Sequence, residues 1–454
     1  MITRTLSAVI GVALLLTGTL TAQNWAPKFE KFTLKNGLDV ILHRDTTLPL
    51  ISVSMAYRAG SSADKPGKTG IAQIAGEHLM LGTRKVPREK LLEFRSKYNA
   101  MIQAQTGVDW VNLSTTMPMN HLEAAIMIEA DRLESIDDAL TAESVGAAIK
   151  RLREEHAARA QKPLGTLNPK IFQELYDERH PYRHVTIGDA DDLDSIGLAD
   201  VRAFVRRNYH PGNGSLTIGG NFSLSAARNY VEKYFGRIQG NRGAQKWKTD
   251  AVFTPIGQGG FILEDNIRYN QLMLVFPTVA AGHPDEPALR LLAQVLAGSN
   301  EAVLRRNLPK QNPNIISVEA SQSSQEVTGT FWLTITCKMD AQLQPVYDDV
   351  MRIVAAIADG GVPEDDLVSA RNHMSMAFFA PMEAFYGFGG RCDLLNLGNL
   401  LAGSPLFNFN QFHASLAAGS PSLQRAAGSY LTQNNQLVVS ILPAGKSSQA
   451  VTLQ

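Results

Sequence analysis

GIAQIAGEHLMLGT, at residues 70–83, is the stretch around which the rest of this chain can be interpreted. It lies between an apolar, strand-like run at residues 51–56 and a charged, helix-like segment at residues 87–98. Within it, Glu77 and His78 match the last two members of the inverted zinc-binding pattern H-x-x-E-H. In that pattern two histidines four residues apart share one helical face and bind zinc, and the adjacent glutamate activates the metal-bound water.

The place of the first histidine is occupied by Ile74, an apolar side chain that cannot bind zinc. Gln73 lies about 140° around an ideal helix from His78, so it could replace the histidine only if Gly76 made a local bulge. A glutamine carbonyl is also a poorer zinc ligand than an imidazole. The sequence therefore predicts a zinc motif with one ligand lost, and leaves open whether the site is silent or altered.

A third ligand for such a site comes from a later helix, and Glu154 and Glu155 are the candidates here. His78 and Glu155 with water could hold a metal only weakly, because catalytic zinc normally has three protein ligands. On composition alone, these residues are more simply explained as polar positions on a partly exposed helix and on a solvated charged face.

Composition excludes several classes of protein. The chain has 454 residues, which is enough for about two to four ordinary domains. Hydrophobic residues make up 44% of it, so it can build buried cores. Lys plus Arg and Asp plus Glu each number 43, so no basic field is available to hold a nucleic acid. The two cysteines, Cys337 and Cys392, could form a bridge or remain buried thiols.

Residues 1–22 are typical of a secretory signal peptide. Arg4 gives a positively charged start, residues 6–16 are an apolar run, and TGTLTA leads to a predicted cleavage near Ala22. The apolar run is shorter than the roughly 20 residues that span a membrane, although an uncleaved anchor is the alternative. The sequence therefore predicts a secreted or periplasmic protein without a membrane segment after cleavage.

The remaining sequence predicts an α+β protein with two similar domains. Strand and helix patterns at residues 28–240 are followed by a polar, Gly-, Lys- and Arg-rich linker at residues 241–254, and by a second set at residues 255–454. Near the end of each half, a helix pattern, a polar turn and a strand pattern follow one another, at residues 201–219 and 423–442. This internal repeat predicts two homologous domains of about 200 residues each.

Hydrophobic periodicity predicts the individual elements. Strands are expected on both sides of the turn at residues 35–37 and at residues 51–56, 110–117, 214–220, 260–264, 271–276, 331–338 and 437–442. Helices are expected within residues 70–83 and at residues 87–98, 121–135, 142–160, 167–179, 198–208, 224–235, 286–296, 343–358, 364–379 and 423–431.

Short motifs follow one another along both halves. In the first half they include LKNGL at residues 34–38, EHLM at 77–80, DWVN at 109–112, EADR at 129–132 and HPY at 180–182. In the second half they are GFGGR at residues 387–391 and DL at 393–394. By their order and spacing, nearly the whole predicted mature chain resembles the M16 metallopeptidases, the group of pitrilysin, insulinase and the mitochondrial processing peptidase.

The resemblance implies two similar α+β domains, each a mostly antiparallel sheet with helices packed on it. In active members of the family, two histidines and a glutamate from the later helix bind zinc, and the glutamate of the first motif is the general base. Carried over, Glu77 matches the base, His78 the second histidine and Glu155 the zinc glutamate, with Glu154 as the alternative.

Two departures from the family pattern fall in this one site. Ile74 or Gln73 occupies the place of the first histidine, and Ala148 occupies the place of a further glutamate seven residues before the zinc glutamate. The resemblance therefore implies zinc as the only cofactor to consider, with weak or absent binding.

The resemblance also implies a role. Many two-domain members form heterodimers around a chamber, in which one subunit has lost the zinc motif and supplies substrate contacts, often an Arg and a Tyr. Arg391 and Tyr386 are the candidates, although the usual spacing is not reproduced. We therefore expect the non-catalytic partner of an M16 chain with a complete motif, acting on peptides. The alternatives are an active zinc metalloendopeptidase with altered ligands and a peptide-binding or assembly module.

Overall fold

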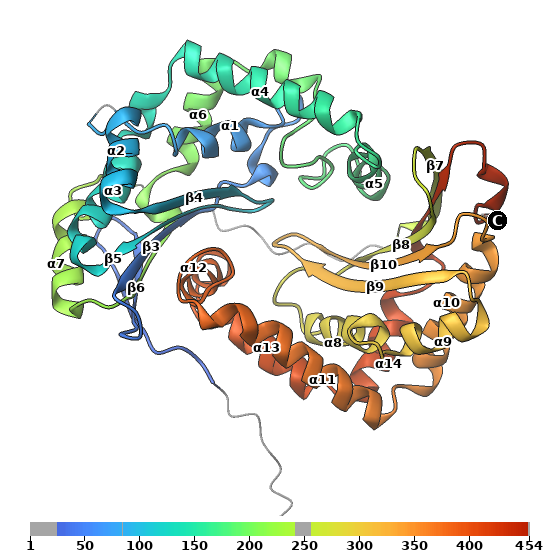
Figure 1. The fold of residues 1–454 in the computed structure, drawn as a ribbon. Coiled ribbons are helices and arrows are strands. Elements are labelled where there is room, and N and C mark those ends of the chain that lie inside the picture. The colour runs from blue at the N-terminus through green and yellow to red at the C-terminus, as the bar shows by residue number, and fades with distance from the viewer. Residues whose placement is uncertain (1–24, 84, 241–255, 453–454) are drawn as a thin grey trace, which may run out of the picture.

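The structure is a computed structural model that describes residues 25–83, 85–240 and 256–452. It contains two β-sheets, each with its own layer of helices (Figure 1). The predicted signal peptide at residues 1–22 and the predicted linker at residues 241–254 lie outside the described residues. Within the described ranges, every helix is too short or too polar to cross a membrane.

The first sheet has six strands in the order β1–β2–β6–β3–β5–β4. They are β1 (Glu30–Thr33), β2 (Asp39–Arg44), β3 (Leu50–Tyr57), β4 (Met101–Thr106), β5 (Val111–Pro118) and β6 (Gly214–Gly220). β2 and β6 are parallel, and the other pairs are antiparallel. The predicted hairpin is the β1–β2 pair, and its turn holds Gly37 at φ +93°, a conformation that favours glycine.

Alternation along the strands of this sheet separates an apolar face from a polar one. In β3, Ile51, Val53 and Met55 point into the first hydrophobic core, whereas Ser52 and Ser54 are buried on the opposite face. The helices beside the apolar face are α1 (Ile71–His78), α2 (Arg88–Tyr98), α3 (Leu122–Ser135), α4 (Ala142–Ala160), α6 (Leu198–Asn208) and α7 (Leu224–Phe235).

The second sheet repeats this plan with five strands in the order β7–β11–β8–β10–β9. They are β7 (Gly257–Asp265), β8 (Asn270–Thr278), β9 (Ile315–Ser324), β10 (Gly329–Cys337) and β11 (Asn435–Pro443). β7 and β11 are parallel and the other pairs antiparallel, as for β2 and β6 in the first sheet. The predicted α+β class with two similar halves is therefore confirmed, while the residue bounds of the two domains remain a prediction.

The helices of the second half are α8 (Glu286–Ala297), α9 (Val303–Gln311), α10 (Leu343–Gly360), α11 (Glu364–Phe379), α12 (Arg391–Ala402), α13 (Phe407–Ala417) and α14 (Ser420–Tyr430). The sequence patterns did not predict β4, β9, α9, α12 or α13. β9 has a largely polar sequence, and α12 buries polar as well as apolar side chains, so neither shows a clean hydrophobic period.

Each half of the chain has one helix that packs on the sheet of the other half. α12 packs on β3 and β6, on the side of the first sheet that faces the second half (Figure 1). This contact combines polar and apolar parts: Asn396 Nδ2 donates to the Ser54 backbone oxygen at 3.1 Å, Asn399 Nδ2 donates to Ser215 Oγ at 2.9 Å, and Leu395 shares a buried cluster with Ile41. The first sheet therefore buries both of its faces, one under its own helices and one under α12.

The reciprocal helix is α5 (Leu167–Leu175), which packs on β7 and β11 of the second sheet. This contact is apolar, because Ile171 and Leu175 join a buried cluster with Val439 and Ile441. The two contacts differ in chemistry. Together they connect the halves at both sheets, α12 at the first and α5 at the second.

Both cysteines are buried and free, so they do not form a bridge in this structure. Cys337 belongs to the core of the second half, whereas Cys392 lies against Gly219 of the first sheet.

Candidate functional site

α1 carries the two residues that match the zinc motif, and a buried carboxylate fixes the start of this helix. Asp64 accepts hydrogen bonds from the backbone N–H groups of Gly70, at 2.7 Å, and Ala72, at 2.9 Å. These N–H groups lie at the helix N-terminus, where no intrahelical partner is available. Burial raises the pKa of Asp64 to about 8. The orientation of α1, and with it that of Glu77 and His78, is therefore set by a side chain outside the motif.

His78 is 1% exposed, and both of its ring nitrogens have partners. Nδ1 lies 2.7 Å from the backbone oxygen of Ile74, and Nε2 lies 3.1 Å from Ser144 Oγ. Because a carbonyl oxygen only accepts, the proton of a neutral imidazole belongs on Nδ1. Burial lowers the pKa of His78, which favours this neutral form. Nε2, the nitrogen that could bind a metal, thus faces a serine hydroxyl.

Ser144 reaches His78 because it forms the first turn of α4. Thr141 caps this helix by accepting a hydrogen bond from the Ser144 N–H at 3.0 Å, and Ser144 Oγ accepts one from the Thr141 N–H at 3.0 Å. This reciprocal arrangement is a capping box. It holds the Ser144 hydroxyl at the end of α4 that lies against α1.

Arg151, also from α4, lies between the two carboxylates of the predicted site. Its guanidinium forms an ion pair with Glu77 and lies 3.6 Å from Glu155 Oε2. Glu77 Oε1 also accepts a hydrogen bond from Gln73 Nε2 at 2.9 Å, and Glu155 Oε1 lies 2.6 Å from Arg159 Nη2. The structure thus brings Glu77 and Glu155 to one place, but the cation between them belongs to the protein.

The other predicted positions do not add a donor to this site. Ile74 is fully buried in the first core, and Ala148 belongs to the same core. Glu154 is an exposed residue of α4 with Lys150 at 4.0 Å. Of the two candidate glutamates, Glu155 is the one that the structure places beside Arg151.

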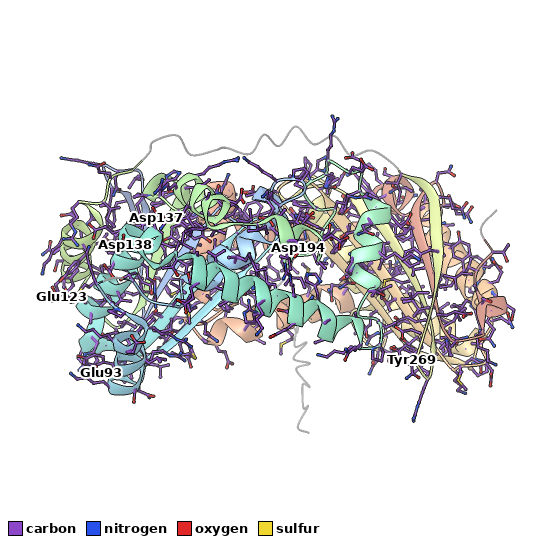
Figure 2. All side chains as sticks on the ribbon, turned by 90° about the horizontal axis from the view of Figure 1, so that it is seen from above. Glu93, Glu123, Asp137, Asp138, Asp194 and Tyr269 are labelled. Carbon is purple, nitrogen blue, oxygen red and sulfur yellow. The ribbon has the colours of Figure 1, made fainter. Side chains whose placement is uncertain are left out.

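The three arginines of α4 are all engaged with acids. Arg153 pairs with Asp194, which is labelled beside this long helix in Figure 2. Arg159 pairs with Glu155, and Arg151 contacts both Glu77 and Glu155. α4 therefore carries ion pairs on more than one face, and only those of Arg151 reach α1.

This set of donors does not fit a zinc ion. Catalytic zinc has three protein ligands and an open position. Here Ile74 offers no donor, His78 Nε2 faces Ser144, and a zinc ion at Glu77 would lie beside the Arg151 cation. Among the described residues, no group of three or more His, Cys, Asp or Glu side chains is placed to hold a metal. No catalytic step through zinc follows from this geometry.

Arg391 connects the two halves of the chain. Its guanidinium forms an ion pair with Asp45, its Nε donates to His43 Nε2 at 3.2 Å, and its Nη1 donates to the Met382 backbone oxygen at 2.7 Å. The side chain is 12% exposed. The donors of Arg391 are thus occupied within the chain. Its contact with a substrate remains a prediction.

Tyr386 lies in the loop before α12, where its partly buried ring contacts Phe385 edge-on at 5.4 Å between centroids. α12 and α1 lie on opposite faces of the first sheet (Figure 1). The structure therefore does not bring Tyr386 and Arg391 together with the Glu77–Arg151–Glu155 cluster within one chain.

Arg151 and Ser144 are the site residues that sequence reasoning missed. Arg151 is four residues before Glu155 and shares its helical face, so a basic side chain at this spacing was a usable signal. Ser144 carried no comparable signal, because its contact with His78 depends on how α4 packs against α1.

Comparisons with known sequences agree with this fold. A family model described as the peptidase M16 inactive domain matches residues 195–374. The chain is 23% identical to the zinc protease PqqE of Helicobacter pylori, over 84% of this chain and 85% of that one. It is 20% identical to the uncharacterized zinc protease YmxG of Bacillus subtilis, over 78% and 85%. It is 24% identical to a probable mitochondrial-processing peptidase subunit beta of Schizosaccharomyces pombe, over 47% and 46%.

Solved structures share the whole arrangement. A protease from Helicobacter pylori superposes with a TM-score of 0.80 at 18% identity, covering 92% of this chain and all of that one. A peptidase M16 inactive domain from Pseudomonas fluorescens superposes with a TM-score of 0.78 at 18% identity, covering 94% of this chain and all of that one. With the repeated sheet topology, these likenesses show that the chain has the fold of the M16 peptidases and resembles them in sequence over most of its length.

Proposed function

We propose that this chain is the non-catalytic subunit of a two-chain M16 zinc peptidase that acts on peptides. The observation that carries the proposal is the Arg151 guanidinium between Glu77 and Glu155. Relatives that match most of this chain are named zinc proteases, whereas here one ligand position is Ile74 and the cation is an arginine. The chain therefore keeps the fold of these relatives, but its side chains do not provide the ligands that zinc chemistry requires.

Arg151 opposes a metal for a simple electrostatic reason. A guanidinium stays protonated at every pH a protein tolerates, so Arg151 cannot lose its charge when a zinc ion approaches. The side chain is 48% exposed, and such pairs contribute only about 0–1 kcal/mol to stability. The consequence of Arg151 is therefore expected in metal affinity more than in folding.

The proposed partner is a second M16 chain with a complete H-x-x-E-H motif, and the proposed location is outside the cytoplasm. A relative described as a peptidase subunit supports the idea of a multi-chain enzyme. The signal-like residues 1–22 support export to the periplasm or the medium.

The test is to produce the mature chain alone and together with an M16 chain that has the complete motif. We expect the chain alone to contain less than stoichiometric zinc by elemental analysis and to leave an unstructured fluorogenic peptide uncut. The two chains together should co-purify and cut the peptide, and a chelator should abolish the cleavage. Robust chelator-sensitive cleavage by the chain alone would overturn the proposal.

Two matched substitutions assign the chemistry within the complex. Replacing the motif glutamate of the partner by glutamine should abolish cleavage. Glu77→Gln in this chain should leave the rate within about twofold, because Glu77 is paired with Arg151. Loss of cleavage with Glu77→Gln would favour the alternative of an active site with altered ligands.

A further inference from the structure

A small cavity between the two halves of the chain is lined mainly by aromatic rings. Its volume is about 150 Å³. Phe172, Tyr176 and Tyr182 come from α5 and the segment after it, and Trp332 comes from β10. Both halves are thus needed to form the cavity, and none of these four rings belongs to the Glu77–Arg151–Glu155 cluster.

The rings of this cavity are held by hydrogen bonds at their polar ends. The Tyr182 hydroxyl donates to Asp109 Oδ1 at 2.9 Å and accepts from the Val327 N–H at 2.9 Å. Trp332 Nε1 donates to Thr330 Oγ1 at 2.8 Å. Since these ends are engaged, the two side chains are fixed without any ligand.

Two buried carboxyl groups in contact with this site share one basic partner. Asp109 Oδ2 accepts from the Glu326 N–H at 3.0 Å, and Glu326 is 6% exposed with no hydrogen-bond donor on either carboxylate oxygen. Arg58 Nε lies 3.4 Å from Glu326 Oε1, but Arg58 donates its hydrogen bonds to the backbone oxygens of Leu400 and Leu401 at the end of α12. Burial raises the pKa of Glu326 to about 8, as expected for a carboxylate that lacks full compensation.

The two acids are adjacent to residues that line the cavity, and Asp109 accepts a hydrogen bond from Tyr182, which lines it. Val108 and Gln325, the chain neighbours of Asp109 and Glu326, both line the cavity. His184 lines it as well; its side chain is 8% exposed, and its Nδ1 has no hydrogen-bond partner. A buried ring nitrogen without a partner is costly, so the wall contains one position that a ligand N–H group could satisfy.

We propose that this cavity is a binding site for an alkylammonium group, such as a lysine side chain or a small organic amine. Aromatic rings attract a cation through their quadrupoles, the carboxyl groups of Asp109 and Glu326 lie next to lining residues, and the volume suits a group of about butylammonium size. A bound cation would favour the ionised form of Glu326, whose carboxylate oxygens have no hydrogen-bond donor, whereas an anion or a neutral alkyl group would not. The inference is independent of the proposed function.

Binding at this cavity should also join the two halves. The lining residues come from residues 108–184 and from residues 323–332. A ligand that binds only the folded chain raises the melting temperature by mass action. Thermal unfolding therefore provides a readout that requires no enzymatic activity.

The test uses the full mature chain and isothermal titration calorimetry with two cations, n-butylammonium and Nα-acetyl-lysine methylamide. The matched neutral ligands are 1-butanol and Nα-acetyl-norleucine methylamide. Both cations, or the free amine alone, should bind at least tenfold tighter than the neutral ligands and raise the melting temperature. Binding of the lysine derivative assigns the site to peptide side chains, and binding of the free amine alone assigns it to small amines.

Two substitutions locate the site. Trp332→Leu should weaken cation binding about tenfold, by removing a cation–π contact. Glu326→Gln should weaken binding of the cations but not of the neutral ligands. Asp393→Asn, at another buried carboxyl outside the cavity, is the matched control and should change neither. Equal affinity for cations and neutral ligands, absence of binding by all four, or equal loss in the Asp393 variant would overturn the proposal.

Discussion

Arg151 shows how one side chain can decide what a retained motif does. It lies on the same face of α4 as Glu155 and reaches Glu77 on α1, so a protein cation is shared by the two carboxylates that could otherwise face a metal. Neither Glu77 nor His78 reveals this from the sequence. The residue that matters for metal binding thus lies outside the recognised H-x-x-E-H pattern.

At the residue scale, we predict that Arg151→Met increases zinc affinity at least about tenfold in an Ile74→His background. Ile74→His returns a ligand at the spacing that shares a face with His78, and Arg151→Met removes the competing cation. Zinc affinity can be measured by competition with a chromophoric chelator, with melting curves to show that each variant is folded.

The matched control for this prediction is Arg153→Met in the same background. Arg153 is on the same helix and pairs with Asp194, away from Glu77. It should leave zinc affinity unchanged. If the Arg151 and Arg153 variants bound zinc equally well, the role assigned to Arg151 would be wrong.

At the scale of single elements, α5 and α12 each attach one half of the chain to the sheet of the other half, and they do so with different chemistry. α5 presents Ile171 and Leu175 to an apolar sheet surface, so its attachment depends on burial of apolar area. α12 presents Asn396 and Asn399 to a sheet surface that contains serines, so its attachment depends on hydrogen bonds as well as on the apolar contact of Leu395. This contrast explains why the pattern of hydrophobic residues predicted α5 but not α12.

For α12, we predict that Asn399→Ala destabilises the chain by about 1–3 kcal/mol. The substitution leaves Ser215 Oγ buried without the Asn399 donor and removes the 3.0 Å hydrogen bond to Asp39. Urea unfolding measures the change. Asn372→Ala, on the exposed side of α11, is the control and should stay within about 0.5 kcal/mol; similar effects of the two variants would contradict the polar contact.

For α5, we predict that Ile171→Ala destabilises the chain by about 2–5 kcal/mol, because Ile171 is fully buried and its removal leaves a cavity. Ile171→Val removes one methyl group and should cost only about 0.5–1.5 kcal/mol. The same urea experiment applies. A loss for Ile171→Ala no larger than that for Ile171→Val would show that α5 does not depend on apolar packing.

At the scale of the whole molecule, the two halves are tied by polar contacts at the start of α12. His43 Nδ1 lies 2.7 Å from the Lys28 backbone oxygen, so Nδ1 must donate and Nε2 must be the bare nitrogen that accepts from Arg391. Asp45 completes the group by pairing with the same guanidinium. The contact therefore requires a neutral His43.

We predict that this contact weakens in acid. Burial, followed by the Arg391 cation, lowers the pKa of His43 below its ordinary value of 6.5. The folded chain then binds fewer protons than the unfolded chain, so this contribution to stability is present above about pH 6.5 and is lost as the pH falls through the folded pKa. Urea unfolding between pH 7.5 and pH 5 measures it.

His43→Gln isolates this contribution from the other titrating groups. An amide can donate to the Lys28 oxygen and accept from Arg391, but it does not titrate. The stability of the native chain relative to His43→Gln should decrease from pH 7 to pH 5. A constant difference across that range would exclude His43 as the source of the pH dependence.

The sequence by itself determined many of the elements and their repetition. The bounds of α4, α6, α7, β6 and α11 agree with the hydrophobic periods, because a period of 3.6 or 2 residues is a local property of the chain. The loss of a histidine at Ile74 and the choice of Glu77, His78 and Glu155 as candidates were also readable from the order of residues.

Only the tertiary structure decided what those residues contact. Whether Arg151 reaches Glu77, whether Ser144 meets His78 and whether α12 covers the first sheet depend on packing between segments separated by 66 or more residues. Hydrophobic period carries no information about such pairs, because it records which face of an element is buried and not against which element. For that reason the motif could be found in the sequence, while the contact of Arg151 with Glu77 could be found only in the fold.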